Sequence, residues 1–537
     1  MKKEKNKIKL EHIPYLISSC ICGVLVGAVI FIFKVIASAV ISLSESAYLF
    51  VRDNPIYLPL LIISASLLGV FSAFILRAAP EGKGGGIPTA ISVIRGLVKF
   101  NWVKSLFSMF TSAMLTYLCA VPLGNEGPSV QMGTALGRGC VRMFGEKNVA
   151  MDKYVMTGGA CAGFAAATGA PLTGILFAFE ETHKRFSPLI FSVSAICAVS
   201  ATTMMKVLCD ITSVPFSLFH FADVQILPIA YMPIALLVGI ACGGFAVLLS
   251  KGYGSVRNIL STRLSRIPFI AKIIIAFSIV SLFGFVSADF IGSGHHLVEH
   301  LVLGQGVWYL MLICLVVRAV LLLFANNIGV TGGLFVPTLA FGALCGAIVG
   351  KALVSIDLLP EDYYSVAVII GIASVLAAFS HTPLMAIAFS LEALGAVENI
   401  LHVIIGVAVA YVFVERFAAA PFTDVVIEAK VEDVHRGKES SLVDAELIVK
   451  RGSFIVGKEI RDILWPPMCM VTSVIKNPDI KHREGGFIYE GDKLLVHFIS
   501  YDVDRTMHEL ESYIGSQNDI LSSKVADVNT NDSIPEI

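Results

Sequence analysis

The sequence contains several long segments with almost no charged residues, and these constrain the fold more than any other feature. Four of them are Ile13–Val40, Tyr57–Leu76, Pro228–Leu249 and His402–Val414. Each approaches the roughly 20 apolar residues that a helix needs to cross a bilayer. Only 15% of the residues are charged, against about 25% in an average soluble domain. We therefore predict an all-α, polytopic membrane domain and not a soluble protein with buried helices.

The N-terminal segment is rich in lysine. The lysines that precede the first apolar segment are Lys2, Lys3, Lys5, Lys7 and Lys9. By the positive-inside rule, such a segment stays in the cytoplasm. A signal peptide can begin in the same way, but no short apolar run ending in a small-residue cleavage site follows. We expect a retained first helix and a multi-pass protein of the plasma (inner) membrane, with both termini in the cytoplasm.

Composition also excludes several function classes. The net charge is −1, which gives no indication of a nucleic-acid partner. The 11 cysteines are mostly scattered, and no pair has the spacing of a zinc site. No Ser/His/Asp grouping or nucleotide loop appears. We expect no metal site, no resident cofactor and no enzymatic activity.

The composition changes near Pro421, which divides the chain into regions. We predict a cytoplasmic segment over residues 1–12, a transmembrane domain over 13–420 and a linker over 421–442. Short β-branched runs broken by Gly, Asn and Pro then indicate a small soluble α/β domain over 443–515. The final stretch, 516–537, is polar and poor in aromatic residues and is expected to be disordered.

The membrane domain contains an internal repeat. Ala165–Glu180 aligns with Ala377–Glu392, and Gly124–Gly137 aligns with Gly333–Gly346 at nearly the same offset. The identical pairs include Pro171/Pro383, Phe177/Phe389, Glu180/Glu392, Gly124/Gly333 and Pro128/Pro337. Repeats of this size are typical of transporters built from two halves, with the binding site between the halves. The alignment alone leaves open whether the repeat is inverted or parallel.

Three segments combine Gly and Pro between apolar flanks: Gly82–Pro88, Gly124–Pro128 and Gly332–Pro337. In a bilayer, non-helical backbone survives only inside protein or beside a wet cavity. The helix after each break exposes N–H groups and the positive end of its dipole. If the three helix starts converge, they form an anion site without a fully charged side chain. Ordinary turns between spans are the alternative.

Acidic residues at membrane depth are functional candidates, because burying a carboxylate in a bilayer is costly. Glu126 lies inside the second break, where its ionised form can occupy an anion site and its protonation can empty that site. Glu180 and Glu181 follow an apolar run and are candidates for proton transfer. Glu392 and Arg318 are interpreted as structural. For Glu181 and Glu180, a position at a cytoplasmic helix end is the alternative.

Together, these motifs resemble the CLC family of chloride channels and exchangers. The chain has GGGIP where the family usually has GSGIP, GNEGP where it usually has GREGP, and GGLFVP, which fits its GxFxP. The resemblance covers residues 10–425. It implies a homodimer with one pore in each subunit, and each subunit is made of two inverted halves. It implies that Glu126 is the external gating glutamate and Glu181 the internal proton-transfer glutamate. It also implies that the backbone N–H groups of Leu334 and Phe335 face the anion.

The chain departs from the family pattern at three positions. Gly85 replaces a Ser whose hydroxyl contacts the anion, Thr423 stands where a Tyr closes the internal side, and Asn125 replaces an Arg. These changes put chloride preference and tight coupling in question and make a polyatomic anion such as nitrate plausible. Fluoride ranks low, because fluoride-exporting relatives usually lack the internal acid, which is present here as Glu181.

Residues 449–498 resemble the C-terminal regulatory domain of potassium-uptake proteins, the RCK-C or TrkA-C type. The GxxxxGK run ending at Lys458 and a Gly-Asp pair before a hydrophobic strand carry this resemblance. We do not expect a phosphate-binding loop, because no Ser or Thr follows Lys458 and no Walker context follows. The resemblance implies dimerisation and a possible cyclic dinucleotide ligand, with a purely structural appendage as the alternative.

The leading hypothesis is an exchanger of chloride or a related anion against protons. Its rivals are a passive channel of the same fold, a membrane-bound enzyme and a non-transporting sensor. The internal acid Glu181 favours the exchanger, and the missing inner Tyr favours the channel.

Overall fold

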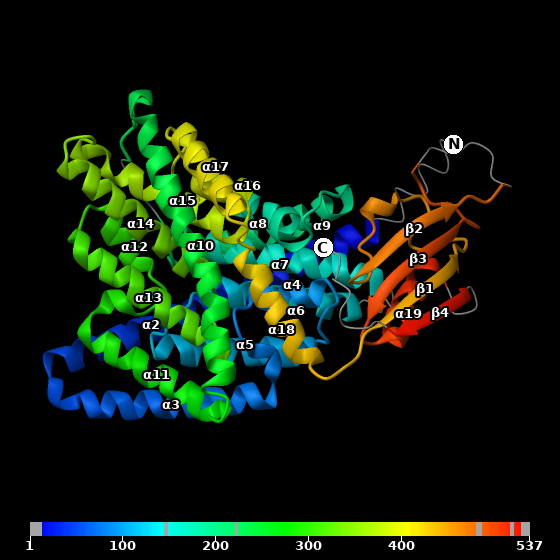
Figure 1. Cartoon of the computed structure of the whole chain (residues 1–537), viewed down its shortest axis with the longest axis horizontal. Helices are drawn as coiled ribbons and strands as arrows, with labels where there is room; N and C mark the ends of the chain where they lie inside the picture. Colours follow the sequence, from blue (N-terminus) through cyan, green and yellow to red (C-terminus); the bar gives the residue numbers. More distant parts are fainter. Residues whose placement is uncertain are drawn as a thin grey trace.

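The structure, a computed structural model, describes residues 13–143, 149–219, 221, 224–478, 486–515 and 520–527. The predicted segment 1–12 lies outside them. Most of the described chain is helical (Figure 1). The helices of the membrane domain are α2 (Ile13–Asp53), α3 (Leu58–Ala78), α4 (Ile87–Ile94), α5 (Trp102–Leu118), α6 (Glu126–Met143), α7 (Val149–Thr168), α8 (Pro171–Phe177), α9 (Pro188–Thr212), α10 (Met232–Thr262), α11 (Phe269–Val286), α12 (His295–Val302), α13 (Trp308–Ile328), α14 (Phe335–Ser355), α15 (Tyr364–Ser380), α16 (Pro383–Ala393), α17 (Ile400–Arg416) and α18 (Phe422–His435).

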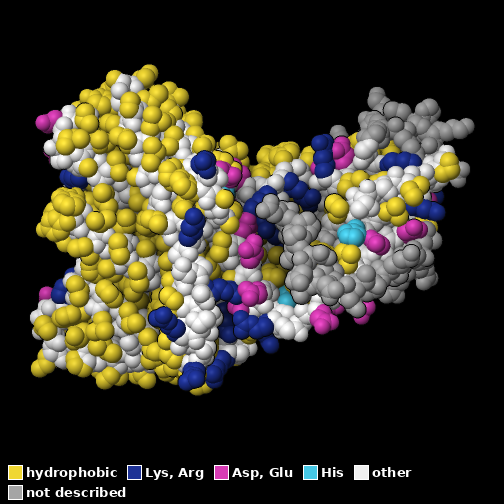
Figure 2. All heavy atoms as spheres, viewed as in Figure 1, with side chains coloured by type: hydrophobic (Ala, Val, Ile, Leu, Met, Phe, Trp, Pro, Cys, Tyr) yellow, Lys and Arg dark blue, Asp and Glu magenta, His cyan; other side chains and the backbone are white. Residues whose placement is uncertain are grey.

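The predicted polytopic membrane domain is confirmed. Among the described residues, eight helices are long and apolar enough to cross a membrane. Large apolar side chains such as Phe71, Leu248 and Val320 are well exposed on the outside of this domain. Hydrophobic side chains cover the membrane domain in the view of Figure 2, whereas charged side chains gather where it meets the C-terminal domain. This distribution fits a lipid-facing surface.

The two sequence repeats form two structurally equivalent halves. Glu180, at the end of the first-half repeat, accepts hydrogen bonds from Leu384 N and Met385 N at the start of α16 (3.0 and 2.6 Å). Its counterpart Glu392 accepts from Leu172 N and Thr173 N at the start of α8 (2.8 Å each). Each helix therefore ends beside the start of its equivalent, so α8 and α16 run antiparallel. This is the arrangement of an inverted repeat, which the sequence alignment had left open.

The segment predicted to be a linker, residues 421–442, is largely helical. Helix α18 occupies most of it and packs against α4. Lys430 on α18 donates to Lys83 O (3.2 Å) and to Thr89 Oγ1 (2.6 Å). Pro421 directly precedes the helix, where its fixed φ and missing N–H suit a helix start. The membrane domain thus extends past the change in composition, and the linker prediction is wrong for this segment.

The C-terminal region is a small α/β domain, as predicted. Its four-stranded antiparallel sheet has the order β2-β3-β1-β4, and α19 (Val503–Ile514) packs against β1. The strands are β1 (Ser441–Ile448), β2 (Cys469–Ile475), β3 (Lys493–Ser500) and β4 (Ile520–Asp527). Strand β4 lies inside the tail predicted to be disordered. The prediction is wrong for this stretch, because its backbone pairs with the edge of β1; residues 516–519 and 528–537 lie outside the described part.

The Gly-Asp pair before β3 has a structural role. Gly491 adopts a φ of +76°, which favours glycine. The buried Asp492 carboxylate accepts from Asn477 N (3.0 Å) and Tyr489 N (2.9 Å) and pairs with Lys476 (3.1 Å). Burial alone would raise the pKa of Asp492, but these hydrogen bonds and the Lys476 charge together lower it. The Gly491–Asp492 pair therefore holds together the end of β2 and the start of β3.

The C-terminal domain contacts the membrane domain through the loop that contains Asp462 and Ile463 and through α19. The carbonyl of Asp462 accepts from Tyr154 Oη (2.6 Å), and the carbonyl of Ile463 accepts from Arg185 Nη2 (2.7 Å). Lys153 on α7 forms a buried ion pair with Glu509 on α19. Because one partner without the other would leave an uncompensated buried charge, this contact fixes the two domains relative to each other.

Candidate anion and proton site

The three Gly/Pro breaks meet backbone to backbone. A Cβ built on Gly86 would lie 2.2 Å from the carbonyl of Gly127, and one on Gly127 would lie 2.6 Å from Gly333 Cα and 2.5 Å from Gly85 O. Each distance is too short for a side chain. The glycines therefore allow the starts of α4, α6 and α14 to converge, as the sequence predicts.

The second and third breaks are also hydrogen-bonded to each other. Gly124 N donates to Gly333 O (2.8 Å), and Gly333 N donates to Gly124 O (2.7 Å). This antiparallel bridge joins two residues that the sequence repeat makes equivalent. Because it joins equivalent residues, the bridge lies on the symmetry axis between the halves. It holds the starts of α6 and α14 close together.

A small buried cavity lies at this junction. Its volume is about 20 Å³, enough for a water-sized species. It is lined by the first turns of α4 and α14 and by α15, and four of the predicted site residues take part. The lining residues are Ile87, Pro88, Glu181, Leu334, Phe335, Thr338, Leu376, Phe379, Ser380 and Thr423. The two helix starts direct N–H groups and positive dipole ends toward it, which favours an anion.

Glu126 begins α6 at the junction of the three breaks and is fully buried, although it is not one of the residues that line the cavity. Its carboxylate faces the backbone N–H groups of Glu126 itself and of Val336 in the first turn of α14, but neither oxygen forms a fully aligned hydrogen bond with a described residue. The side chain folds back over its own break, because a Cβ on Gly124 would lie 2.6 Å from Glu126 Oε2. A buried carboxylate is costly to leave unsatisfied, so this group is free to gain a proton or to exchange places with an anion.

Glu181 lines the cavity and is 5% exposed. It sits in a π-helical turn, Ala178–Thr182, that follows α8; such turns often occur at functional sites. Thr423 Oγ1 donates to Glu181 Oε1 (2.8 Å). Arg95 holds the turn by donating to the carbonyls of Glu181 (3.1 Å) and Thr182 (2.8 Å). The internal acid and the residue at the missing Tyr position are therefore in direct contact.

Glu180, the neighbouring candidate, is placed differently. Both of its oxygens accept backbone N–H groups at the start of α16, and it does not line the cavity. The structure gives it the same helix-capping contacts as Glu392. The side chains of the adjacent residues Glu180 and Glu181 thus point in different directions, and of the two only Glu181 lines the cavity.

Gly85 lies next to the cavity and brings no side chain to it; its carbonyl accepts from Ile87 N (2.7 Å). A Cβ here would meet Leu334 Cδ1 and Asn326 Nδ2, both at 3.3 Å. The Asn326 amide is buried and its Nδ2 has no hydrogen-bond partner among the described residues. The sequence analysis missed Asn326. Two features of the sequence could have indicated it. Asn326 is a polar residue near the end of the apolar α13, eight positions before Leu334, and the chain lacks the usual hydroxyl at Gly85.

Solved structures with the same architecture are transporters. A structure described as a slow cyanobacterial Cl⁻/H⁺ antiporter superposes with a TM-score of 0.72 at 21% identity, covering 79% of this chain and 99% of that one. A CLC-type fluoride/proton antiporter gives 0.64 at 22% identity, with 77% and 97% covered. A eukaryotic CLC transporter gives 0.64 at 15% identity, with 78% and 74% covered.

The sequence itself matches the family described as "Voltage gated chloride channel" over residues 68–415. That match spans the three breaks, both halves of the repeat and the two buried glutamates. The chain therefore belongs to the voltage-gated chloride channel (CLC) family.

Proposed function

We propose that this protein is a secondary active exchanger that couples transport of chloride, or a related small anion, to protons. The observation that carries the proposal is a pair of buried glutamates near the converging helix starts: Glu181 lines the small cavity, and Glu126 begins α6, whose break packs against the break before α14. Similarity to structures described as Cl⁻/H⁺ and F⁻/H⁺ antiporters supports it.

In this proposal, Glu126 is the external gate. Its ionised carboxylate competes with an anion for the helix starts, since both are stabilised by the same N–H groups. Protonation removes that competition and lets the anion enter. Anion binding and proton binding at Glu126 are thereby linked, which is the requirement for exchange.

Glu181 is the internal proton donor and acceptor, and Thr423 connects it to the anion. When Glu181 is ionised, the Thr423 hydroxyl donates to the carboxylate. When Glu181 is protonated, that hydroxyl is released and can donate to an anion in the cavity that both residues line. Thr423 thus supplies a second link between proton and anion occupancy.

The anion is held by the backbone N–H groups of Leu334 and Phe335, with the Asn326 amide in place of the absent hydroxyl at Gly85. An amide N–H donates to an anion without contributing a full charge, so binding remains reversible. These donors suit chloride and also a polyatomic anion such as nitrate. Fluoride ranks below both, because Glu181 is present.

A passive anion channel of the same fold is the second candidate. The observation that favours it is the short side chain at Thr423, which contacts Glu181 and leaves the inner side without the aromatic ring usual in the family. In that case anions pass without moving protons.

We further propose a homodimer in the plasma (inner) membrane with both termini in the cytoplasm.

The C-terminal domain acts as an RCK-C-like regulator in this proposal, because its loop holds Arg185, four residues after Glu181. The cavity between the two domains has a volume of about 60 Å³, far below the roughly 300 Å³ of small-molecule sites. A cyclic dinucleotide would therefore bind on another surface, such as one formed by two copies.

The proposal is tested with purified protein in liposomes under an imposed chloride gradient, repeated with nitrate and fluoride gradients. Uphill proton movement driven by the anion is the expected result, and the anion that drives it most strongly is the substrate. Anion flux without proton movement would instead establish the channel.

A further inference from the structure

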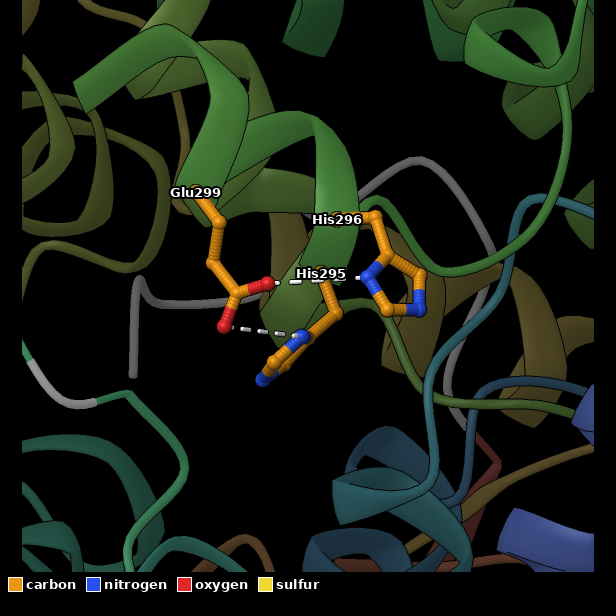
Figure 3. Close-up of side chains that lie close together, drawn as sticks. All are labelled: His295, His296 and Glu299. Atoms are coloured by element: carbon orange, nitrogen blue, oxygen red, sulfur yellow. Dashed lines mark ion pairs between the residues drawn. The ribbon is translucent and has the colours of Figure 1, made fainter. Parts of the chain in front are cut away.

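Two histidines and a glutamate form a compact cluster at the start of α12, away from the anion cavity (Figure 3). His295 Nδ1 lies 3.7 Å from one oxygen of Glu299, and His296 Nδ1 lies 3.5 Å from the other. One ligand atom from each of the three residues lies within 4.8 Å of the others. Two metal–ligand bonds of about 2.1 Å span about 4.2 Å at most, so the three side chains would have to draw closer together around an ion, and the His296 ring is exposed.

The second nitrogen of each ring already faces an acceptor. His295 Nε2 lies 2.5 Å from Leu218 O, and His296 Nε2 lies 3.4 Å from a carboxylate oxygen of Glu45. These acceptors favour the tautomer with the proton on Nε2, which leaves the Nδ1 lone pair directed toward Glu299. Histidines that bind metal ions are usually oriented in this way by a carbonyl or carboxylate behind the ring.

The His295 ring is also held by packing. It stacks on the buried ring of Phe219 with centroids 4.8 Å apart and an interplanar angle of 12°. His296 is exposed, and His295 and Glu299 are half-buried. The cluster thus combines an oriented ligand with access from solvent, which an exchangeable ion requires.

We propose that His295, His296 and Glu299 form a binding site for a divalent transition metal ion of the Zn²⁺ type, with an open coordination position. Two imidazoles and one carboxylate suit Zn²⁺, Ni²⁺ or Cu²⁺, whereas Mg²⁺ and Ca²⁺ prefer oxygen ligands throughout. The same contacts would be simple ion pairs if both imidazoles were protonated. An imidazolium can donate to the same acceptors, so measured metal binding is what separates the two alternatives.

The site would join three parts of the chain. Glu45 belongs to α2 in the first half, Leu218 and Phe219 to the connection between the halves, and the ligands to α12 in the second half. Helix α12 packs on α14, whose first turn lines the anion cavity. In Figure 1, α12 lies on the side of the membrane domain away from the C-terminal sheet. A bound ion would therefore fix the start of α12, and with it the ring contacts to the other two parts, whatever the transported anion is.

The test uses the purified, chelator-treated full-length protein in detergent, with Zn²⁺ binding measured by calorimetry and by the shift of the melting temperature. We expect one saturable site that raises the melting temperature of the wild type, and no comparable effect of Mg²⁺ or Ca²⁺. His296→Gln and Glu299→Gln should each abolish this binding. His300→Gln, on the exposed face of the same helix, is the matched control and should bind as the wild type does.

Glu45→Gln probes the outer contact and should weaken Zn²⁺ binding about tenfold. Each variant is first melted without metal, and a variant that does not fold is replaced by the other ligand variant. Absence of saturable Zn²⁺ binding in the wild type, or equal binding by Glu299→Gln and His300→Gln, would overturn the proposal.

Discussion

The two halves of the membrane domain share a scaffold but differ in chemistry. Gly124 and Gly333 bond to each other, and Glu180 and Glu392 cap equivalent helices. At the position of Glu126, however, the second half has Phe335. At the position of Glu181 it has Ala393. Residues that obey the repeat hold the structure, and the ionisable residues proposed to move protons occur only where the repeat is broken.

Replacing the gate of the first half should have the largest effect. Of the equivalent residues Glu126 and Phe335, only Glu126 is an acid. The glutamine in Glu126→Gln cannot alternate between ionised and protonated forms. We expect proton movement to fall to background while anion flux persists, because the neutral amide no longer competes as an anion. The measurement is parallel anion and proton flux in liposomes. Retained coupling would show that Glu126 is not the gate.

The equivalent glycines should respond unequally to the same change. A Cβ on Gly333 would lie 2.6 Å from the backbone nitrogen of Gly127, which cannot move aside, whereas a Cβ on Gly124 meets the flexible Glu126 carboxylate at 2.6 Å. Gly333→Ala should therefore lower stability by about 3 kcal/mol, with a clear fall in melting temperature. Gly124→Ala should fold but displace the gate and alter transport. Equal losses of stability would contradict the asymmetry described here.

The symmetric caps should respond equally. Glu180→Ala and Glu392→Ala each remove a carboxylate that accepts two backbone N–H groups at a helix start. Each change should cost about 1–2 kcal/mol and lower the melting temperature by similar amounts. Neither should selectively reduce proton movement. A loss of coupling in Glu180→Ala alone, at unchanged stability, would return Glu180 to the proton path.

Replacing Asn326 tests whether its amide takes the place of the hydroxyl that is missing at Gly85. Asn326→Leu keeps the shape but removes the donor, and we expect about tenfold weaker chloride binding in calorimetry. The double variant Gly85→Ser with Asn326→Ala restores a hydroxyl in the space freed beside Leu334 and should recover part of that loss. If Asn326→Leu binds chloride as the wild type does, the amide does not contact the anion.

Much of the fold could be predicted from the sequence, because its determinants are local. Apolar segments, Gly/Pro breaks and repeated motifs identified the membrane domain, the two halves and the convergence of helix starts. Helix α18 was not predicted, since its mixed composition resembles a linker, and only its packing on α4 and the bonds of Lys430 show its place. Strand β4 was missed because a polar sequence gains its order from pairing with β1.

The candidate site was predicted in part. Motif position indicated Glu126, Glu181, Leu334 and Phe335, but adjacent residues such as Glu180 and Glu181 look alike in a sequence and separate only through the direction of their side chains. Asn326 depends on a contact between α13 and a distant break, which no local pattern contains. Arg318, interpreted as structural, donates to the carbonyls of Asp289, Ile291 and Gly292 (2.9, 2.9 and 2.8 Å).

The most direct test of the account compares proton-to-anion coupling in Glu181→Gln and Glu180→Gln, measured side by side in liposomes under one chloride gradient. The account predicts that Glu181→Gln loses proton movement but retains anion flux, whereas Glu180→Gln keeps the wild-type ratio. Loss of coupling in Glu180→Gln, or wild-type coupling in Glu181→Gln, would contradict it.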